Sequence, residues 1–414
     1  MRKIAAGLAA LAAVYAAPAS ATNGMRMIGF GPVQDSMGGA SVAAPLDGAT
    51  AVTNPAGLTA LGRSTDVSGT FFNPTVKYAA GSMSPTQPVA SGNTLESDRA
   101  PSYIPTLALV WPSTDRVTLG LGALGVSGMG VDYATDLYGG TTTTSYMNAR
   151  IAPAAGYRVS DQLSVGVSAN LMYATMKYAV ASGMGMAPRD TAGAFGFGYT
   201  VGIQYRPVEI VTLGLAYESK SYFQDFSFDV PAQTMQTARG PFPTPGGTEK
   251  LAFDQPQVAT GGVAVRPLPA LLVAADVEWI NWSQTNGKDM PEFTTAQTQT
   301  GYLPWNLGWD DQVVFKIGAE YAATSALKVR AGYNYGKSPL DPSRAFENIA
   351  FPAIAEHHIT AGAGYAFGGF VLNAAVMYSP EAKLSGSGDP TTGIAAYSTK
   401  MSQLAFDLGA TYRF

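Results

Sequence analysis

Residues 404–414 read LAFDLGATYRF, and this stretch decides the fold because apolar side chains alternate in it with small or polar ones. Successive side chains of a β-strand point to opposite faces, so Phe406 and Leu408 share one face while Asp407 and Thr411 share the other. One face suits lipid and the other suits water. In a soluble sheet the apolar face would instead cover a core, so this strand alone leaves both environments open.

The first 21 residues have the features of an export signal. A basic pair at positions 2–3 precedes an apolar run at 4–17 and small residues at 19–21. This order is typical of a secretory signal peptide, and cleavage is expected before Thr22. An exported bacterial chain with such a terminal strand is expected in the outer membrane.

Composition also favours a membrane barrel. Hydrophobic residues make up 46% of the chain and charged residues only 13%, while 47 Gly, 21 Tyr and 18 Phe favour strands over helices. Beyond Thr22 no apolar run approaches the roughly 18 residues that a spanning helix needs. The absence of cysteine excludes disulfides and thiolate chemistry. Without Arg2 and Lys3 the 25 basic residues fall to 23 against 29 acidic ones, and this charge of −6 argues against nucleic acid as a partner.

A pattern that recurs six times counts the strands. An aromatic residue or valine ends one apolar strand, a few turn residues follow, and the next strand begins. The instances are Trp111 before Val117, Tyr157 before Leu163, Tyr205 before Val211, Val265 before Leu271, Tyr321 before Leu327 and Tyr365 before Val371. Long connections rich in Gly, Pro, Ser and Thr separate these hairpins, and such asymmetry is typical of outer-membrane barrels with short periplasmic turns. Six hairpins, one preceding strand and the terminal strand predict a fourteen-stranded antiparallel transmembrane barrel over residues 64–414.

Charged residues within the predicted strands indicate which face looks into the lumen. Lys316, Lys328 and Arg330 occupy the parity opposite to their apolar neighbours. A cation facing lipid near the bilayer midplane costs about 2–4 kcal/mol, so the polar face is expected to line the lumen. Glu278 and Glu320 are available there as ion-pair partners.

Residues 22–63 do not alternate and are rich in glycine. This stretch is too small to fold alone, so it is expected to lie inside the barrel as a plug, or hatch, domain. Within it Asn54 can cap a helix whose first position is Pro55, followed by Ala56, because proline lacks only an N–H that would be unpaired there. A short helix through Leu61 is expected.

Taken together, the export signal, the glycine-rich segment ending in Asn54-Pro55-Ala56, about fourteen strands and the terminal phenylalanine resemble the FadL family of outer-membrane channels for hydrophobic compounds. This family includes long-chain fatty acid transporters and toluene-type aromatic hydrocarbon channels. The likeness covers nearly the whole mature chain. Residues 128–133 and 138–142 resemble the kinked third strand of the family and its following loop, while 281–284 and 335–339 resemble the ends of its ninth and eleventh strands.

The resemblance implies passive uptake through a side opening. Ligand would bind the extracellular loops, enter a pocket in the barrel, and leave through the wall at the third-strand kink when the plug rearranges. Asn54, Pro55 and Ala56 would then act in gating, and Gly125, Gly128 and Gly130 would form the opening. The ligand-binding candidates are Met129, Val131, Tyr133, Met184 and Met186. Fatty acids and neutral hydrocarbons both remain open as substrates.

Several alternatives stand beside this interpretation. Glycines in the third strand, such as Gly120 and Gly122, can simply make room for the plug, and Trp305 and Trp309 are expected to be interfacial anchors rather than ligand contacts. His357 and His358 are the only histidines, and because neighbouring strand residues point to opposite faces, no shared metal and no catalytic pair is expected.

The sequence therefore predicts a monomeric channel that is not an enzyme and needs no cofactor. Its expected partners are a hydrophobic small molecule, outer-membrane lipid and lipopolysaccharide, and the barrel-assembly machinery at the C-terminal strand. A structural or adhesive surface protein is the competing function. A general hydrophilic porin is a third possibility, disfavoured because a plug would block it.

Overall fold

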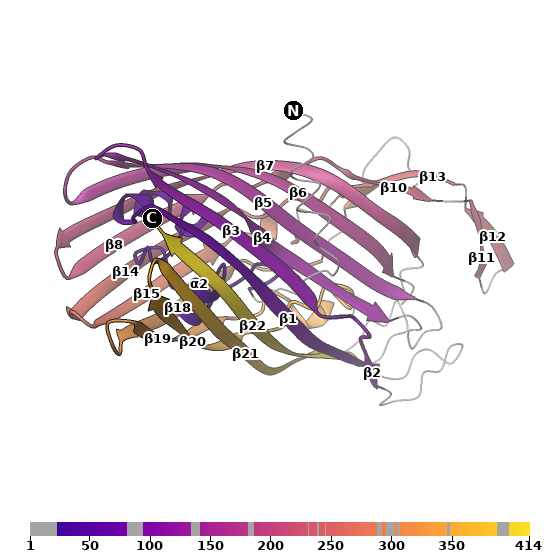
Figure 1. Ribbon diagram of the computed structural model, residues 1–414. Helices are drawn as coiled ribbons and strands as arrows, with labels where there is room; N and C mark the ends of the chain where they lie inside the picture. The colour runs from indigo at the N-terminus through magenta and orange to yellow at the C-terminus, as the bar shows by residue number, and fades with distance from the viewer. Residues whose placement is uncertain are drawn as a thin grey trace.

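Fourteen strands of the described chain form a closed antiparallel ring (Figure 1). The computed structural model describes residues 23–80, 94–133, 141–180, 186–230, 232–237, 240–244, 246–287, 292–294, 303–304, 307–345, 348–386 and 397–414. The ring contains β1 (Ser64–Ala80), β3 (Ser102–Pro112), β4 (Val117–Tyr133), β5 (Thr142–Arg158), β6 (Leu163–Val180), β7 (Met186–Val208), β8 (Val211–Glu218), β14 (Val258–Leu268), β15 (Leu271–Ile280), β18 (Gln312–Ala322), β19 (Leu327–Gly336), β20 (His357–Phe367), β21 (Phe370–Gly386) and β22 (Tyr397–Arg413). Because β1 pairs with both β3 and β22, the ring is closed, which confirms the predicted fourteen-stranded barrel.

The remaining elements are short. They are β2 (Thr94–Glu96), β9 (Tyr222–Phe223), β10 (Phe226–Val230), β11 (Gln233–Thr237), β12 (Gly240–Thr244), β13 (Gly247–Leu251), β16 (Glu292–Thr294), β17 (Leu303–Pro304), the helices α2 (Pro32–Ser36) and α3 (Thr50–Thr53), and the 3-10 helices η1 (Pro55–Ala60), η2 (Trp282–Gln284) and η3 (Pro342–Arg344). Strands β10 to β13 extend from the end of the barrel opposite the C-terminus (Figure 1). No helix within the described ranges is long and apolar enough to cross a bilayer.

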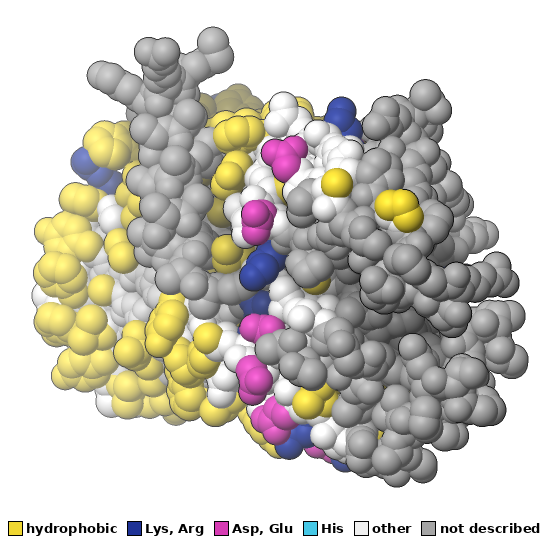
Figure 2. All heavy atoms as spheres, turned by 90° about the vertical axis from the view of Figure 1, so that its right-hand side faces the viewer, with side chains coloured by type: hydrophobic (Ala, Val, Ile, Leu, Met, Phe, Trp, Pro, Cys, Tyr) yellow, Lys and Arg dark blue, Asp and Glu magenta, His cyan; other side chains and the backbone are white. Residues whose placement is uncertain are grey.

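The strands bury one face and expose the other, as the alternating sequence requires. In β18 the side chains of Phe315 and Ile317 are 52% and 50% exposed, whereas Lys316 between them is 7% exposed. Apolar residues therefore face outward and the charged residue faces the lumen, as predicted. Figure 2 looks at the end that carries β10 to β13, where hydrophobic side chains cover one flank and a strip of charged side chains lies beside them.

The N-terminal segment, residues 23–61, packs against the inward side of the wall. Helix α2 contacts β19 to β22, and η1 contacts β4 to β7. The backbones approach so closely that a Cβ atom on Gly166 would lie 2.3 Å from the nitrogen of Ala56, and one on Gly318 would lie 2.4 Å from the oxygen of Met37. Wall glycines thus accommodate the segment where its backbone touches the strands.

Candidate gate in the barrel wall

The wall between β3 and β4 is only partly hydrogen bonded. The β3–β4 register runs from Pro112 opposite Thr118 to Thr106 opposite Leu124. From Pro105 back to Ser102, β3 pairs with β1 alone, while β4 continues to Tyr133 paired with β5. The two strands therefore separate after Leu124, and one edge of β4 is released from the ladder.

Residues 25–27 of the N-terminal segment pair with this released edge. The N–H of Met27 donates to the oxygen of Val126 at 3.2 Å, and the N–H of Gly128 donates to the oxygen of Met25 at 3.0 Å. Arg26 and Ser127 are the bridge partners between these two bonds. A wall inside lipid cannot leave backbone groups unpaired, so the segment supplies the hydrogen bonds that β3 does not.

A short connection closes the other end of this gap. The N–H of Ser97 donates to the oxygen of Val76 in β1, and the N–H of Asp98 donates to the oxygen of Asp132 in β4. The guanidinium of Arg99 donates to the oxygen of Thr144 in β5 at 2.7 Å. The gap therefore has hydrogen-bonded ends at Thr106–Leu124 and at residues 97–99.

The predicted glycines lie along the released part of β4. The β4–β5 register shifts between Gly125 and Ser127, which marks a bulge, and residues 122–131 are buried on both faces. Gly128 bonds to the N-terminal segment, and a Cβ on Gly130 would lie 2.1 Å from both the Arg99 guanidinium and the Thr144 oxygen. Gly120 and Gly122 lie elsewhere, because Cβ atoms there would meet Leu58 and Val52 of the N-terminal segment.

Three of the five predicted ligand residues share one apolar cluster. Met129, Val131 and Tyr133 are buried in a cluster that also contains Tyr146 and Phe253, whose rings pack edge to face with their centroids 5.1 Å apart. We call this set, with the other buried side chains packed on it, the aromatic cluster. Met184 lies outside the described residues, and Met186 begins β7 opposite Val180, with its side chain outside them too.

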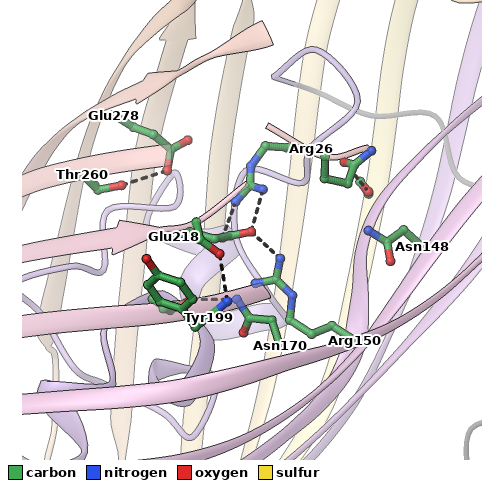
Figure 3. A network of polar contacts seen from close by, with 12 residues as sticks. Arg26, Asn148, Arg150, Asn170, Tyr199, Glu218, Thr260 and Glu278 are labelled. Atoms are coloured by element: carbon green, nitrogen blue, oxygen red, sulfur yellow. Dashed lines mark hydrogen bonds and ion pairs between the residues drawn. The ribbon is translucent and has the colours of Figure 1, made fainter. Parts of the chain in front are cut away.

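A buried ion-pair network joins the N-terminal segment to the wall (Figure 3). Arg26 donates from Nη1 and Nη2 to the two carboxylate oxygens of Glu218 in β8, at 3.2 and 3.0 Å. Arg150 of β5 donates to the same carboxylate. Glu218 therefore holds two guanidinium groups, one from the segment and one from the strand beside β4.

Arg150 keeps unused hydrogen-bonding capacity. Its Nε and Nη1 atoms have no partner, although the side chain is 1% exposed. The Oδ1 atoms of Asn148 and Asn170 nearby are also unpaired (Figure 3). The sequence interpretation missed Arg26, Arg150 and Glu218, but Arg150 has the inward parity of its strand, which was the signal used for Lys316.

The other lumen cations that the sequence singled out are paired. Lys316 lies 3.0 Å from Glu278, while Lys328 and Arg330 lie 2.7 and 2.8 Å from the two oxygens of Glu320. These pairs are the ones that the sequence made available. Within the described ranges no three His, Cys, Asp or Glu side chains come together as metal ligands.

The space between segment and wall is small at this point. A cavity of about 40 Å³ is lined by Arg26, Met27, Glu218 and other residues of the segment and wall. A dry apolar cavity that holds benzene is larger, about 150 Å³. Met27 packs against two apolar clusters, one that includes Ile104 of β3 and one that includes Val126 of β4. This cavity lies between the segment and strands β7, β8, β14, β15 and β18, and it is too small for a ring-sized molecule.

The motif Asn54-Pro55-Ala56 fastens the segment at a second place. The Oδ1 atom of Asn54 accepts from the N–H of Ala56 at 3.2 Å, and Pro55 occupies the first turn of η1. The Nδ2 atom of Asn54 donates to the oxygens of Val42, at 2.7 Å, and of Ile203 in β7, at 3.1 Å. One side chain therefore caps η1, ties the segment to itself and binds it to the wall.

Replacing Asn54 with alanine should loosen the segment without opening the barrel. Loss of the cap and of two amide hydrogen bonds should cost about 2 kcal/mol. We expect faster amide hydrogen exchange in residues 42–60 with unchanged heat-modifiable gel mobility, because the barrel depends on strand pairing. Pro55→Ala is the control with a smaller expected effect, and equal exchange in Asn54→Ala and wild type would contradict the role of the side chain.

The predictions for Trp309 and for the histidine pair have different outcomes. Trp309 is 1% exposed, with its ring 5.1 Å from Trp282 and its Nε1 donating to Asn348, so its prediction as an interfacial anchor was wrong. Loop residues cover it, which periodicity could not indicate, and Trp305 lies outside the described residues. The histidine pair does point to opposite faces, with His358 buried and His357 exposed.

The class of protein follows from comparison with known families. The sequence pattern of the family described as outer membrane protein transport protein (OMPP1/FadL/TodX) matches residues 8–414. The chain therefore belongs to this family of outer-membrane transport proteins. The predicted FadL resemblance and outer-membrane location are confirmed.

Individual relatives are distant in sequence and close in fold. Outer membrane protein P1 of Haemophilus influenzae is 23% identical over 305 residues, which cover 64% of this chain and 63% of that protein. The crystal structure of the Pseudomonas putida toluene transporter TodX is 19% identical, with a TM-score of 0.76 over 94% of this chain and 99% of that one. A Pseudomonas aeruginosa FadL homologue is 17% identical, with a TM-score of 0.73 over 94% and 100% of the two chains. The likeness to the two solved structures shows a shared fold.

Proposed function

We propose that the chain is a passive channel through which hydrophobic molecules cross the outer membrane and leave sideways between β3 and β4. The observation that carries this proposal is the end of the β3–β4 ladder at Thr106 and Leu124. An apolar molecule that leaves through the wall returns to hydrocarbon, whereas a periplasmic exit would expose its surface to water at about 25 cal/mol per Å².

We infer that residues 22–63 are a plug and that residues 25–27 close the gap. The hydrogen bonds of Met25 and Met27 to the released edge of β4 support this role. When these bonds break, Met27 leaves the two apolar clusters on which it packs, and the wall opens locally. Gly125, Gly128 and Gly130 suit such a place because glycine tolerates unusual backbone angles and close contacts. The ring of the other strands stays paired throughout.

Neutral aromatic hydrocarbons are the substrate class that the site supports best. The aromatic cluster around Tyr146 and Phe253 adjoins the gap through Met129, and edge-to-face packing suits aromatic guests. The lumen cations Lys316 and Arg330 are already paired with carboxylates. The fold is shared with the Pseudomonas putida toluene transporter TodX.

Long-chain fatty acids are the second candidate, and Arg150 favours them. Its unpaired Nε and Nη1 atoms could donate to a carboxylate in a water-poor site, where such bonds are strong. A native mass spectrum of detergent-purified protein with its retained ligand separates the two classes. A carboxylic acid that is lost in Arg150→Gln supports fatty acids, and a neutral aromatic ligand retained in that variant supports hydrocarbons.

Several partners belong to the same proposal. The outward apolar face of the barrel would contact outer-membrane lipid and lipopolysaccharide. The barrel-assembly machinery would recognise strand β22, in which Phe406 and Leu408 are exposed. The ring is complete in one chain, so we propose that the protein acts as a monomer without a cofactor.

Replacing Gly128 with valine tests the lateral route. A β-branched side chain favours a regular strand and should narrow the gap, so uptake of a radiolabelled hydrophobic tracer should fall to a small fraction of wild type. Binding of the tracer to the purified protein should persist, because the loops are unchanged.

Gly69→Val is the matched control, because a Cβ on this wall glycine of β1 meets no atom within 4 Å. It should transport normally. Wild-type uptake in Gly128→Val, with an unbroken ladder from Leu119 to Val131 in its structure, would move the exit to the periplasmic side. A deletion strain with unaltered uptake of hydrocarbons and fatty acids would favour a structural or adhesive protein, and rapid sugar permeation in liposomes would favour a hydrophilic porin.

A further inference from the structure

Two aspartates of the N-terminal segment face two aspartates of the wall. Asp35 in α2 meets Asp407 of β22, and Asp47 meets Asp66 of β1. Asp35 and Asp407 are 4% and 1% exposed, and neither oxygen of Asp35 nor Oδ2 of Asp407 accepts a hydrogen bond from a donor within the described residues. Buried carboxyl groups in contact are costly unless a cation or a proton compensates them.

The surroundings of this first pair contain donors but no cation. The hydroxyl of Thr70 donates to Oδ1 of Asp407, and Oδ2 of Asp407 has no donor. The backbone N–H of Gly29 and the carboxylate of Asp47 face Asp35. Among the described groups that act on either carboxyl there is therefore no lysine or arginine, and the nearest charge, on Asp47, repels a second negative charge.

The second pair is better satisfied. Gln34 donates to Asp47 at 3.1 Å, and Asp66 accepts from the N–H of Gly48 at 3.0 Å and from the hydroxyl of Thr411 at 2.5 Å. Arg330 attracts Asp47 and Arg413 attracts Asp66. These donors and cations can support negative charge, which the surroundings of Asp35 and Asp407 cannot.

A hydrogen bond between two carboxyl groups requires a proton on one of them, because carboxylates only accept. We propose that Asp35 and Asp407 form a proton-binding site that holds one shared proton, and that this proton fastens α2 to β22. The proton-binding site itself does not depend on the proposed function. Only its effect on transport rests on the proposed role of the N-terminal segment as a plug. Loss of the proton would place two negative charges in contact and release the segment from this side of the wall.

The direction of the pH dependence follows from the pKa of Asp35. Burial, and then the charge of Asp407, raise this pKa well above its ordinary value. A carboxyl whose pKa is higher in the seated state stabilises seating while it is protonated, and this contribution is lost as the pH rises through the raised pKa. Burial and Asp66 also raise the pKa of Asp47, to about 7, so its contribution is lost in the same direction. The ratio of seated to released segment should fall by up to about tenfold per pH unit for one proton.

Infrared spectroscopy of the full-length protein in D₂O detects the proton directly. A protonated carboxyl has a carbonyl stretch well separated from that of a carboxylate. The difference between wild type and Asp35→Asn, and between wild type and Asp407→Asn, should each contain this band near neutral pH, whereas the exposed control Asp161→Asn should not change it. Absence of the band from both differences would overturn the proposal.

Hydrogen exchange tests the mechanical consequence. The N–H groups of Gly38 and Gly39 bond to the oxygens of Asp35 and Gln34 at 3.0 and 2.9 Å, so peptides covering 32–39 report on the seat of α2. After correction for intrinsic exchange, protection should fall more steeply with rising pH in wild type than in Asp35→Asn, because the amide has no proton to lose and only the contribution of Asp47 still titrates there. Equal pH slopes in both proteins would overturn the fastening. Uptake measured in the same variants tests the plug separately. If the infrared band and the pH slope of protection are as expected but uptake does not change, the proton-binding site is supported and the role of the segment as a plug is contradicted.

Discussion

Joining the N-terminal segment to β4 by a disulfide is expected to stop uptake, and reduction is expected to restore it. Arg26 and Ser127 are bridge partners flanked by two backbone hydrogen bonds, the arrangement of a non-hydrogen-bonded pair. The Cα atoms of such a pair are about 4.5 Å apart, which lies within the range of disulfides. The chain has no cysteine, so Arg26→Cys/Ser127→Cys can form one intramolecular bond only.

The oxidised double variant should take up a hydrophobic tracer no faster than cells without the protein. The single variant Arg26→Cys is the matched control, because it also lacks the ion pair to Glu218 but cannot be locked. Reduction should bring the double variant to the rate of this control. If the oxidised and reduced forms transport equally, residues 25–27 do not move during transport, and the proposed gate is excluded.

Replacing Glu218 with glutamine should release the segment more strongly than any other single change in the network. Arg26 and Arg150 would both lose their shared carboxylate while they stay buried. Breaking a buried ion pair from one side costs about 3–5 kcal/mol, and about 1.4 kcal/mol changes an equilibrium tenfold. The released population should therefore rise by a factor of about 10² to 4 × 10³, seen as faster hydrogen exchange in residues 23–31.

Glu381→Gln is the control for charge removal, because Glu381 pairs with Lys400 on the exposed outer surface. Exposed ion pairs contribute little to stability, so exchange in residues 23–31 should not change. Similar exchange in both variants would mean that the Glu218 network does not hold the segment. The barrel should resist heat equally in both, because neither change touches strand pairing.

The barrel was predictable because its signals are local. Apolar and polar side chains alternate with a period of two wherever one face of a strand meets lipid and the other meets water. Turn residues every few tens of positions mark where such strands end. The same parity placed Lys316 in the lumen beside a strand that carries Glu278. An ion pair between neighbouring strands can be predicted from the order of the strands alone. In a meander that order is the order of the sequence.

The proposed gate was only partly predictable because it depends on contacts between distant segments. Glycines at 125, 128 and 130 indicated where β4 departs from regular pairing, but the segment that replaces β3 there, 25–27, carries no strand signal of its own. Arg26 and Glu218 are 192 positions apart, and their contact requires both the closed ring and the fold of the segment inside it. The burial of Trp309 was not predictable for the same reason, because the residues that cover it belong to other connections between strands.

The seam between β1 and β22 sets the order in which the molecule can be assembled. All seventeen residues of β1 pair with β22, from Ser64 opposite Arg413 to Ala80 opposite Tyr397. The ring therefore stays open until the last of its strands arrives, and afterwards a ladder of backbone hydrogen bonds bars entry through the wall. Because the N-terminal segment directly precedes β1, it can pass through the wall into the lumen only while the seam is open, and after closure only the ends of the barrel remain as a route. Sequence changes that delay its folding should therefore increase the share of barrels that close before the segment is seated.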